Sequence, residues 1–167
     1  NGFVGRNLQS YVAKKEFNKK YHIVGVDREI DLLKKENILL LIKKFNPSYI
    51  INLVGNASSS DFEELALVNA ILSERLLECV VSCSGVEKIL LIGSAAEYGI
   101  QASLPISEDA VLNPKTPYGL SKVLQAQIFH YYADKIAVNL ARTFNIIGPG
   151  IPTSLAVGAF VEKIKNA

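Results

Sequence analysis

The stretch K-I-L-L-I-G-S-A-A-E-Y-G, residues 88–99, decides the fold of this chain. In its first part, 88–94, a lysine is followed by the apolar run 89–93, which ends at Ser94. A strand without a polar face is typical of a parallel sheet that helices cover on both faces. We therefore predict a buried strand whose carboxyl end carries the Ser94 hydroxyl, at the edge where open α/β folds bind ligands. A serine is also an ordinary end to a strand.

The rest of the chain alternates strand and helix patterns. Short apolar runs predict strands, and longer runs with helical periodicity predict helices. The predicted strands are 21–27, 48–54, 88–94 and 137–145, and the predicted helices are 38–45, 64–82 and 117–135. This alternation indicates an α/β fold, a doubly wound parallel sheet of the Rossmann type. The length predicts a single dinucleotide-binding domain over residues 1–167.

The composition argues against several classes of protein. A formal net charge of +2 gives no basis for a nucleic-acid partner. No apolar run reaches the ~20 residues of a membrane span, so we expect no membrane partner and a cytoplasmic location. Cys79 and Cys83 stand four apart in a predicted helix, which favours packed thiols over a metal or redox site. We expect no metal.

The chain begins N-G-F-V-G-R, where Gly2 and Gly5 precede a predicted helix. Small residues let a backbone approach a pyrophosphate, and a helix N-terminus offers N–H donors. In the dinucleotide-binding fold such a turn follows a strand, and none precedes it here. We therefore expect the sequence to be part of a longer protein, without the first strand and most of a C-terminal substrate domain.

Acidic and basic residues follow the predicted strand 21–27. A carboxylate at Asp27 can accept hydrogen bonds from an adenosine ribose, whereas Arg28 can bind a 2′-phosphate, so NAD and NADP both stay open. Asp31 and Leu32 either line the adenine pocket or cap the next helix. The alternative for this whole set is a pair of turn glycines and a surface aspartate.

The stretch T-P-Y-G-L-S-K, residues 116–122, places Tyr118 and Lys122 on one face of a predicted helix. A phenol acts as an acid or base near neutral pH when a nearby cation stabilises the phenolate. Together with Ser94, these residues form a set for moving a proton to or from the oxygen of an alcohol or ketone, beside a hydride carrier. The alternative is a helix with a surface tyrosine and lysine.

Six segments resemble, in order and spacing, the extended short-chain dehydrogenase/reductases, the nucleotide-sugar epimerase/dehydratase group: N-G-F-V-G, V-D, N-L-V-G, G-S-A-A-E-Y-G, P-Y-G-L-S-K and R-T-F-N-I-I-G-P-G. The resemblance implies that Tyr118 is the general acid/base, that Lys122 stabilises its phenolate and binds the nicotinamide ribose, and that Ser94 orients the substrate. It implies an NAD or NADP site and a substrate site. The cofactor residues are Gly2, Phe3, Gly5, Asp27, Arg28, Asp31, Leu32, Val54, Gly55, Asn69, Tyr118 and Lys122, and the substrate residues are Ser94, Ala95, Ala96 and Asn145.

Within that family the segments look most like GDP-4-keto-6-deoxy-mannose reductases. The 4,6-dehydratases carry an acidic base two positions before the tyrosine of the Y-G motif, where this chain has Ala96, and Glu97 is displaced by one. The resemblance implies NAD(P)-dependent reduction of a 4-keto-6-deoxy sugar nucleotide. A 4-epimerase uses the same three residues and stays open. So does a non-catalytic dinucleotide-binding regulatory protein, although a pure binder has no need of Tyr118.

The predicted helices 64–82 and 117–135 carry apolar residues on more than one face, which exceeds what one sheet can cover. The resemblance implies that these helices pair into a four-helix interface between two copies. We expect a homodimer that binds a nucleotide-diphosphate sugar.

Overall fold

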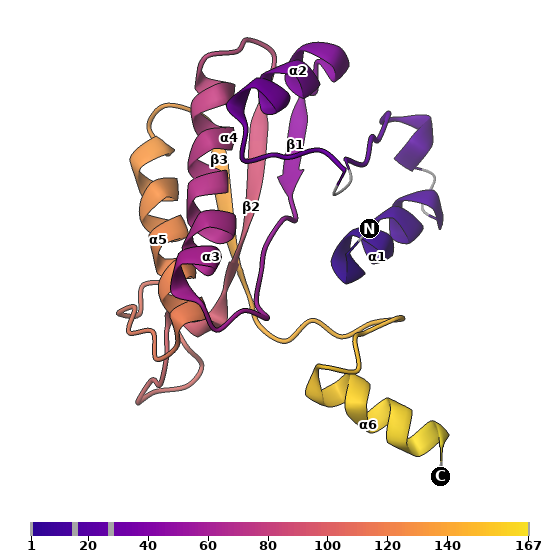
Figure 1. Ribbon diagram of the computed structural model, residues 1–167, viewed down its shortest axis with the longest axis vertical. Helices are drawn as coiled ribbons and strands as arrows, with labels where there is room; N and C mark the ends of the chain where they lie inside the picture. The colour runs from indigo at the N-terminus through magenta and orange to yellow at the C-terminus, as the bar shows by residue number, and fades with distance from the viewer. Residues whose placement is uncertain (1, 15–16, 27–28, 167) are drawn as a thin grey trace. The chain divides into compact units, whose positions relative to one another are not determined.

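The computed structural model describes residues 2–14, 17–26 and 29–166. The chain divides into two compact units. The sheet unit is Ile30–Phe144, and the terminal unit is formed by residues 1–29 and 145–167. Figure 1 shows the helices and strands of both units.

The sheet unit contains a parallel sheet of three strands in the order β1–β2–β3. These strands are β1 (Tyr49–Asn52), β2 (Lys88–Ser94) and β3 (Val138–Thr143). The central strand β2 has the bounds predicted for 88–94, and the other two lie within the predicted 48–54 and 137–145. The prediction of an α/β parallel sheet is confirmed.

The helices of this unit confirm the predicted 38–45, 64–82 and 117–135, with small differences at their ends. They are α2 (Lys35–Phe45), α3 (Phe62–Ala66), the π-helix η2 (Leu67–Ile71), α4 (Leu72–Val81), the 3-10 helix η3 (Ala95–Glu97) and α5 (Pro117–Tyr132). Helices α3, η2 and α4 follow one another without a break, so the long predicted helix contains one π-helical turn. In Figure 1 this long helix and α5 run side by side on one face of the sheet.

The core of the sheet unit lies between β2 and helices α2 and α4. Ile89 and Leu91 of β2 are buried against Ile42 and Leu77. Burying each such side chain contributes on the order of 1.5–3 kcal/mol. Cys79 lies in the same cluster, and Cys79 and Cys83 are both free thiols, as packed thiols would be.

Local signals in the sequence set the ends of these helices. Asp61 caps α3 because its side chain accepts the N–H of Glu63 at 2.9 Å. Helix α2 ends at Asn46, which adopts the left-handed conformation (φ 40°), and Pro47 follows it. Pro117 occupies the start of α5, where a missing N–H costs nothing.

The terminal unit contains α1 (Phe3–Lys14), the 3-10 helix η1 (Phe17–Lys19) and α6 (Ala156–Lys165). The side chain of Asn7 joins its two segments by donating to the carbonyl oxygens of Phe3 at 3.0 Å and Pro149 at 2.9 Å. Among the residues described, none of the helices is long and apolar enough to cross a bilayer.

The predicted strand 21–27 is wrong over its described part. Residues 21–26 form no strand, and Ile23, Val24 and Val26 are 40–48% exposed. A strand leaves its N–H and C=O groups unpaired until another strand lies beside it, and 21–26 has no such partner among the described residues. The sequence pattern shows that a segment can be a strand but not that its partner is present.

Candidate active site

Ser94 ends β2 and begins the short helix η3. Its Oγ accepts the N–H of Ala96 at 3.2 Å, and Oε1 of Glu97 accepts the N–H of Ser94 at 2.7 Å. This reciprocal capping box explains why the chain turns immediately after the strand. Because the Ser94 hydroxyl acts here as an acceptor, its own O–H can still donate to a ligand.

Tyr118 is the second residue of α5, a helix whose first turn packs closely on η3. Thr116 caps this helix by accepting the N–H of Gly119 at 3.0 Å. A Cβ added at Gly119 would lie 2.6 Å from the carbonyl oxygen of Ala96. The missing side chain therefore allows the turn that carries Tyr118 to approach η3.

Lys122 is almost fully buried, with 4% of its surface exposed. Its Nζ donates to the carbonyl oxygen of Ile92 at 2.6 Å, two residues before Ser94. Burial lowers the pKa of Lys122 to about 8, and the negative charge of Glu97 acts in the opposite direction. An ammonium group whose pKa is near 8 thus lies beside the end of β2.

Asn69, in the π-helix η2, is fully buried and holds two segments together. Its side chain accepts the N–H of Asn56 at 2.9 Å and donates to the Asn56 carbonyl at 2.8 Å. It also donates to Oγ of Ser121 at 2.9 Å, and Ser121 donates to the Tyr118 carbonyl at 2.7 Å. Asn69 therefore connects the loop after β1 with the helical turn that carries Tyr118.

The remaining predicted cofactor residues of the sheet unit lie in loops. Val54 and Gly55 follow β1, and a Cβ added at Gly55 would lie 3.3 Å from Oδ1 of Asn69. Asp31 does not cap α2, because the cap position is Lys34 and Asp31 accepts the N–H of Leu33 instead. The capping interpretation of 31–32 is therefore wrong.

The other predicted site residues belong to the terminal unit. Helix α1 begins at Phe3, so Gly5 lies inside its first turn rather than before the helix. No atom lies within 4 Å of a Cβ added at Gly2, so the backbone is open there. Asn145 is exposed. Residues 27–28, which include the predicted Asp27 and Arg28, lie outside the described residues.

The structure brings Lys122 to Ile92 and the first turn of α5 to η3, both next to the carboxyl end of β2. Ser94, Tyr118 and Lys122 therefore belong to adjoining elements of one unit. That these three residues, with Ala95 and Ala96, form a catalytic and substrate site stays a prediction.

Sequence reasoning assigned no role to an ion pair at this end of the sheet. Nε of Arg142 lies 2.6 Å from Oε2 of Glu97, whose side chain is fully buried. The signal was present in the sequence: Arg142 stands inside the apolar run of β3, where a charge needs a partner. Its partner, 45 residues away, could not be identified from spacing.

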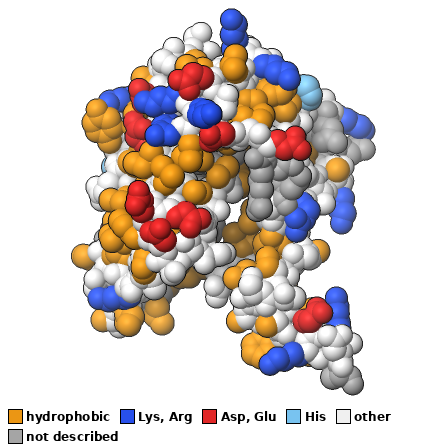
Figure 2. All heavy atoms as spheres, viewed as in Figure 1, with side chains coloured by type: hydrophobic (Ala, Val, Ile, Leu, Met, Phe, Trp, Pro, Cys, Tyr) orange, Lys and Arg blue, Asp and Glu red, His pale blue; other side chains and the backbone are white. Residues whose placement is uncertain are grey.

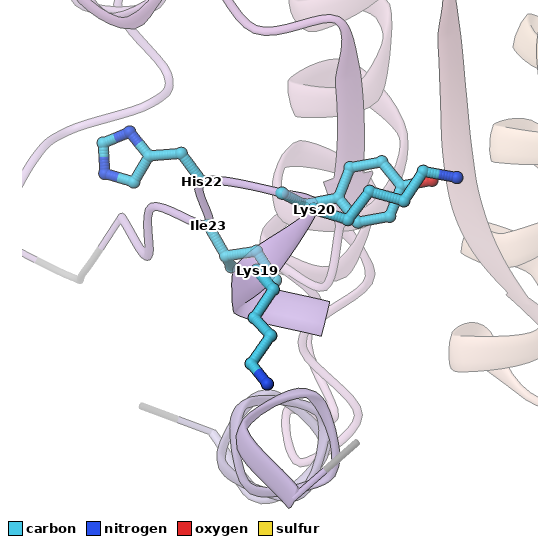
Figure 3. A pocket seen from close by; sticks show the side chains of 5 residues that line it. Lys19, Lys20, His22 and Ile23 are labelled. Carbon is cyan, nitrogen blue, oxygen red and sulfur yellow. The ribbon is translucent and has the colours of Figure 1, made fainter. Parts of the chain in front are cut away.

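A surface pocket of the terminal unit, with a volume of about 600 Å³, lies outside these elements. It is lined by residues 19–23, and none of the predicted site residues is among them. Figure 3 shows the side chains of Lys19, Lys20 and His22 pointing in different directions rather than toward a common point. We assign this pocket no chemistry.

Comparison with known proteins identifies the chain's relatives. Residues 1–167 match the model of the NAD dependent epimerase/dehydratase family. The chain belongs to this family. Membership confirms the resemblance of the six sequence segments and agrees with the parallel sheet of the sheet unit.

Two curated members of the family match nearly the whole chain. GDP-6-deoxy-D-talose 4-dehydrogenase of Aggregatibacter actinomycetemcomitans is 27% identical over 174 residues, which cover 99% of this chain and 58% of that protein. GDP-6-deoxy-D-mannose reductase of Pseudomonas aeruginosa is 28% identical over 171 residues, which cover 98% and 55%.

A solved structure confirms the Rossmann-type fold. RMD from Pseudomonas aeruginosa, complexed with NADPH, aligns with a TM-score of 0.82 at 27% identity, over 98% of this chain and 57% of that chain. The chain thus spans between 55% and 58% of the length of these relatives.

Proposed function

We propose that the protein is an NAD(P)-dependent enzyme that reduces the C4 ketone of a 4-keto-6-deoxy sugar carried on a nucleoside diphosphate. Three things support the proposal: the family, the GDP-deoxyhexose enzymes among the relatives, and the residues at the carboxyl end of β2. The observation that carries it is the burial of Lys122 beside that strand end.

A buried lysine without a carboxylate partner is costly, and this cost supports a functional role for Lys122. Among the residues that the structure describes, no carboxylate forms an ion pair with it, and burial lowers its pKa to about 8. Such perturbed groups concentrate at active sites. In a purely structural interpretation, one hydrogen bond to a carbonyl oxygen would have to offset the free energy of burying the Lys122 ammonium group.

The three side chains have distinct roles in this proposal. The Ser94 hydroxyl donates to the ketone oxygen and orients it. Tyr118 gives its phenolic proton to that oxygen as the alcohol forms, and the Lys122 cation stabilises the phenolate that remains. Bound NADH or NADPH supplies the hydride that the ketone carbon accepts.

The geometry of Glu97 supports a reductase over a dehydratase. A dehydratase needs a carboxylate that faces the sugar, and the corresponding position is Ala96. Both oxygens of Glu97 bind protein groups, Ser94 and Arg142, and its side chain is fully buried. The Glu97 carboxylate is therefore not exposed to a substrate.

The first turn of α1, in the terminal unit, fits a pyrophosphate. The backbone at Gly2 is open, and the first N–H groups of α1 have no intrahelical partners. A pyrophosphate would be held by this turn, Gly2, Phe3 and Gly5. Considered by itself, the sheet unit offers Lys122, and separately the loop residues Val54 and Gly55, for the nicotinamide ribose.

The experiment is an assay of the full-length natural protein with NADH and NADPH against a panel of 4-keto sugar nucleotides, followed by nicotinamide absorbance. We expect consumption of the reduced cofactor, and Tyr118→Phe should lower turnover by about 10²–10⁴-fold while cofactor binding remains. Interconversion of 4-epimers without net consumption would indicate a 4-epimerase. Unchanged turnover of Tyr118→Phe would refute the mechanism.

We also propose that the long helix α3–η2–α4 and α5 form a homodimer interface. Leu67 and Ile71 on the first, and Leu120 and Leu124 on the second, are 37–43% exposed and recur at helical spacing. Figure 2 shows hydrophobic side chains gathered over this side of the molecule among acidic and basic ones. Exposed apolar stripes of this kind are typical of protein interfaces.

Light scattering of Leu120→Glu/Leu124→Glu tests the interface. We expect the wild-type protein to be a dimer and the double variant a monomer, because two buried charges oppose each other across the interface. The matched control is Leu40→Glu on α2, where the leucine is 64% exposed and lies outside these helices. A wild-type monomer at high concentration would contradict the interface.

A further inference from the structure

Glu97 is a buried charge whose two oxygens bind different elements. Oε1 accepts the backbone N–H of Ser94 at 2.7 Å, and Oε2 accepts Nε of Arg142 at 2.6 Å. The side chain is fully buried. One carboxylate thus joins the end of β2 to the neighbouring strand β3.

Arg142 is itself held from three directions. In the sheet register it pairs with Gly93, the residue before Ser94. One terminal nitrogen donates to the carbonyl oxygen of Glu108 at 3.4 Å, and the guanidinium carbon lies 5.3 Å from the centre of the buried Tyr98 ring. These contacts leave the guanidinium little freedom.

The glycine at position 93 leaves room for this ion pair. A Cβ added at Gly93 would lie 2.6 Å from Oε1 of Glu97 and 3.2 Å from Cγ of Arg142. Glycine inside a strand weakens the strand, and a buried ion pair is on balance poor at stabilising a fold. Stability is therefore a weak explanation for the combination of Gly93, Glu97 and Arg142.

The contacts of the pair lead to the predicted catalytic residues. It fixes η3, because the N–H of Ser94 is bound by Glu97. The carbonyl of Ala96, inside η3, is the surface against which Gly119 packs. A shift of η3 would therefore move Ser94 and the first turn of α5, which carries Tyr118, relative to each other.

We propose that Glu97 and Arg142 are a positioning pair that sets the separation of Ser94 and Tyr118 for proton transfer. In this proposal both residues act through other residues and neither binds the substrate. The inference rests on the proposed function. It states that two residues outside the catalytic set align Ser94 with Tyr118. Misplacement of reacting groups by about 1 Å can lower turnover about 10²-fold.

Kinetics of Glu97→Gln, Arg142→Met and the double variant, in the full-length natural protein, test the proposal. Glu97→Gln should lower kcat about 10- to 100-fold and leave the KM for the cofactor within about twofold, because alignment rather than binding is lost. The matched control is Glu78→Gln, which removes a carboxylate from the exposed Lys35–Glu78 ion pair and should leave kcat unchanged.

The double variant separates positioning from stability. It buries no unpaired charge, so its melting temperature should recover toward that of the wild type, even if a single variant folds poorly. Its kcat should remain at least about tenfold low. Recovery of kcat together with the melting temperature would make the pair structural and overturn the inference, as would an unchanged kcat in Glu97→Gln.

Tyr118→Phe, measured in parallel, distinguishes the two proposals. If Tyr118→Phe is inactive while Glu97→Gln is fully active, the positioning role fails and the proposed function stands. If Tyr118→Phe keeps its turnover, the proposed function fails, and the positioning role fails with it.

Discussion

Strand β2 of the sheet unit and the segment 21–26 of the terminal unit have similar apolar sequences but different structures. β2 lies between two strands, and its Ile89 and Leu91 are 1% and 0% exposed. In 21–26, Ile23 is 48% exposed and belongs to no strand. A helix closes its own hydrogen bonds, whereas a strand depends on a neighbour. The terminal unit accordingly contains three helical segments and no strand among its described residues.

The largest effect on stability should come from the centre of the sheet unit. Leu91→Ala removes a fully buried side chain from β2 and should lower the free energy of unfolding by about 2–5 kcal/mol. Urea unfolding of the 167-residue chain, followed by circular dichroism, measures it. A decrease in the free energy of unfolding as small as that for an exposed residue would mean that this core does not stabilise the sheet unit.

The next effect is a dependence on pH. The pKa of Lys122 is about 8 in the folded chain and 10.5 ordinarily, so between these values the unfolded chain binds more protons. Unfolding free energy should therefore rise with pH from about 8 to 10.5, by up to about 3 kcal/mol. Lys122→Met should lack this contribution. When the unfolding free energy of the variant is subtracted from that of the wild type, the difference should therefore rise between about pH 8 and 10.5. If the two curves of unfolding free energy against pH run parallel, burial does not lower the pKa of Lys122.

A smaller effect should come from the contact between α5 and η3. Gly119→Ala places a methyl group 2.6 Å from the carbonyl oxygen of Ala96. The two backbones must separate, at a cost of about 1–3 kcal/mol, although alanine favours the helix itself. Thermal unfolding measures the loss, and turnover of the full-length protein should fall with it. In the thermal unfolding experiment alone, Gly2→Ala is the control for added bulk, because nothing lies within 4 Å of the added Cβ.

The smallest effect is expected in the terminal unit. Ile23→Ala should change the free energy of unfolding of the 167-residue chain by less than about 0.5 kcal/mol, since its side chain is largely exposed. The same urea experiment serves here. A loss as large as that of Leu91→Ala would show that 21–26 is packed in solution, and the contrast between the units would disappear.

The sequence predicted the elements whose stability is local or whose partners are all among the described residues. The strand 88–94 was predicted with its observed bounds because residues 89–93 are all apolar or glycine, and it has strands on both sides. The start of α5 at Pro117 agrees with the predicted 117–135, and the structure shows that this start is set locally, by the cap at Thr116 and by Pro117. The strand predicted for 21–27 was wrong over its described part, 21–26, since pairing is not encoded in the segment itself.

The candidate site was predicted less completely. The proximity of Lys122 to the end of β2 follows from the fold once α5 packs on the sheet. The contact between Asn69 and Ser121 and the Glu97–Arg142 pair join residues 52 and 45 positions apart. Only the folded chain brings these residues together, so no periodic pattern could reveal them.

The π-helical turn at Leu67–Ile71 affects how the long helix can change in length. Its closing bond runs from the N–H of Leu72 to the carbonyl of Leu67, five residues apart instead of four. Removing one residue from an ordinary α-helix rotates everything after it by about 100°. Here the loss of one residue would convert the π-helical turn into an ordinary α-helical turn, and α4 would face the sheet as before. A variant one residue shorter at this point should therefore keep the orientation of α4.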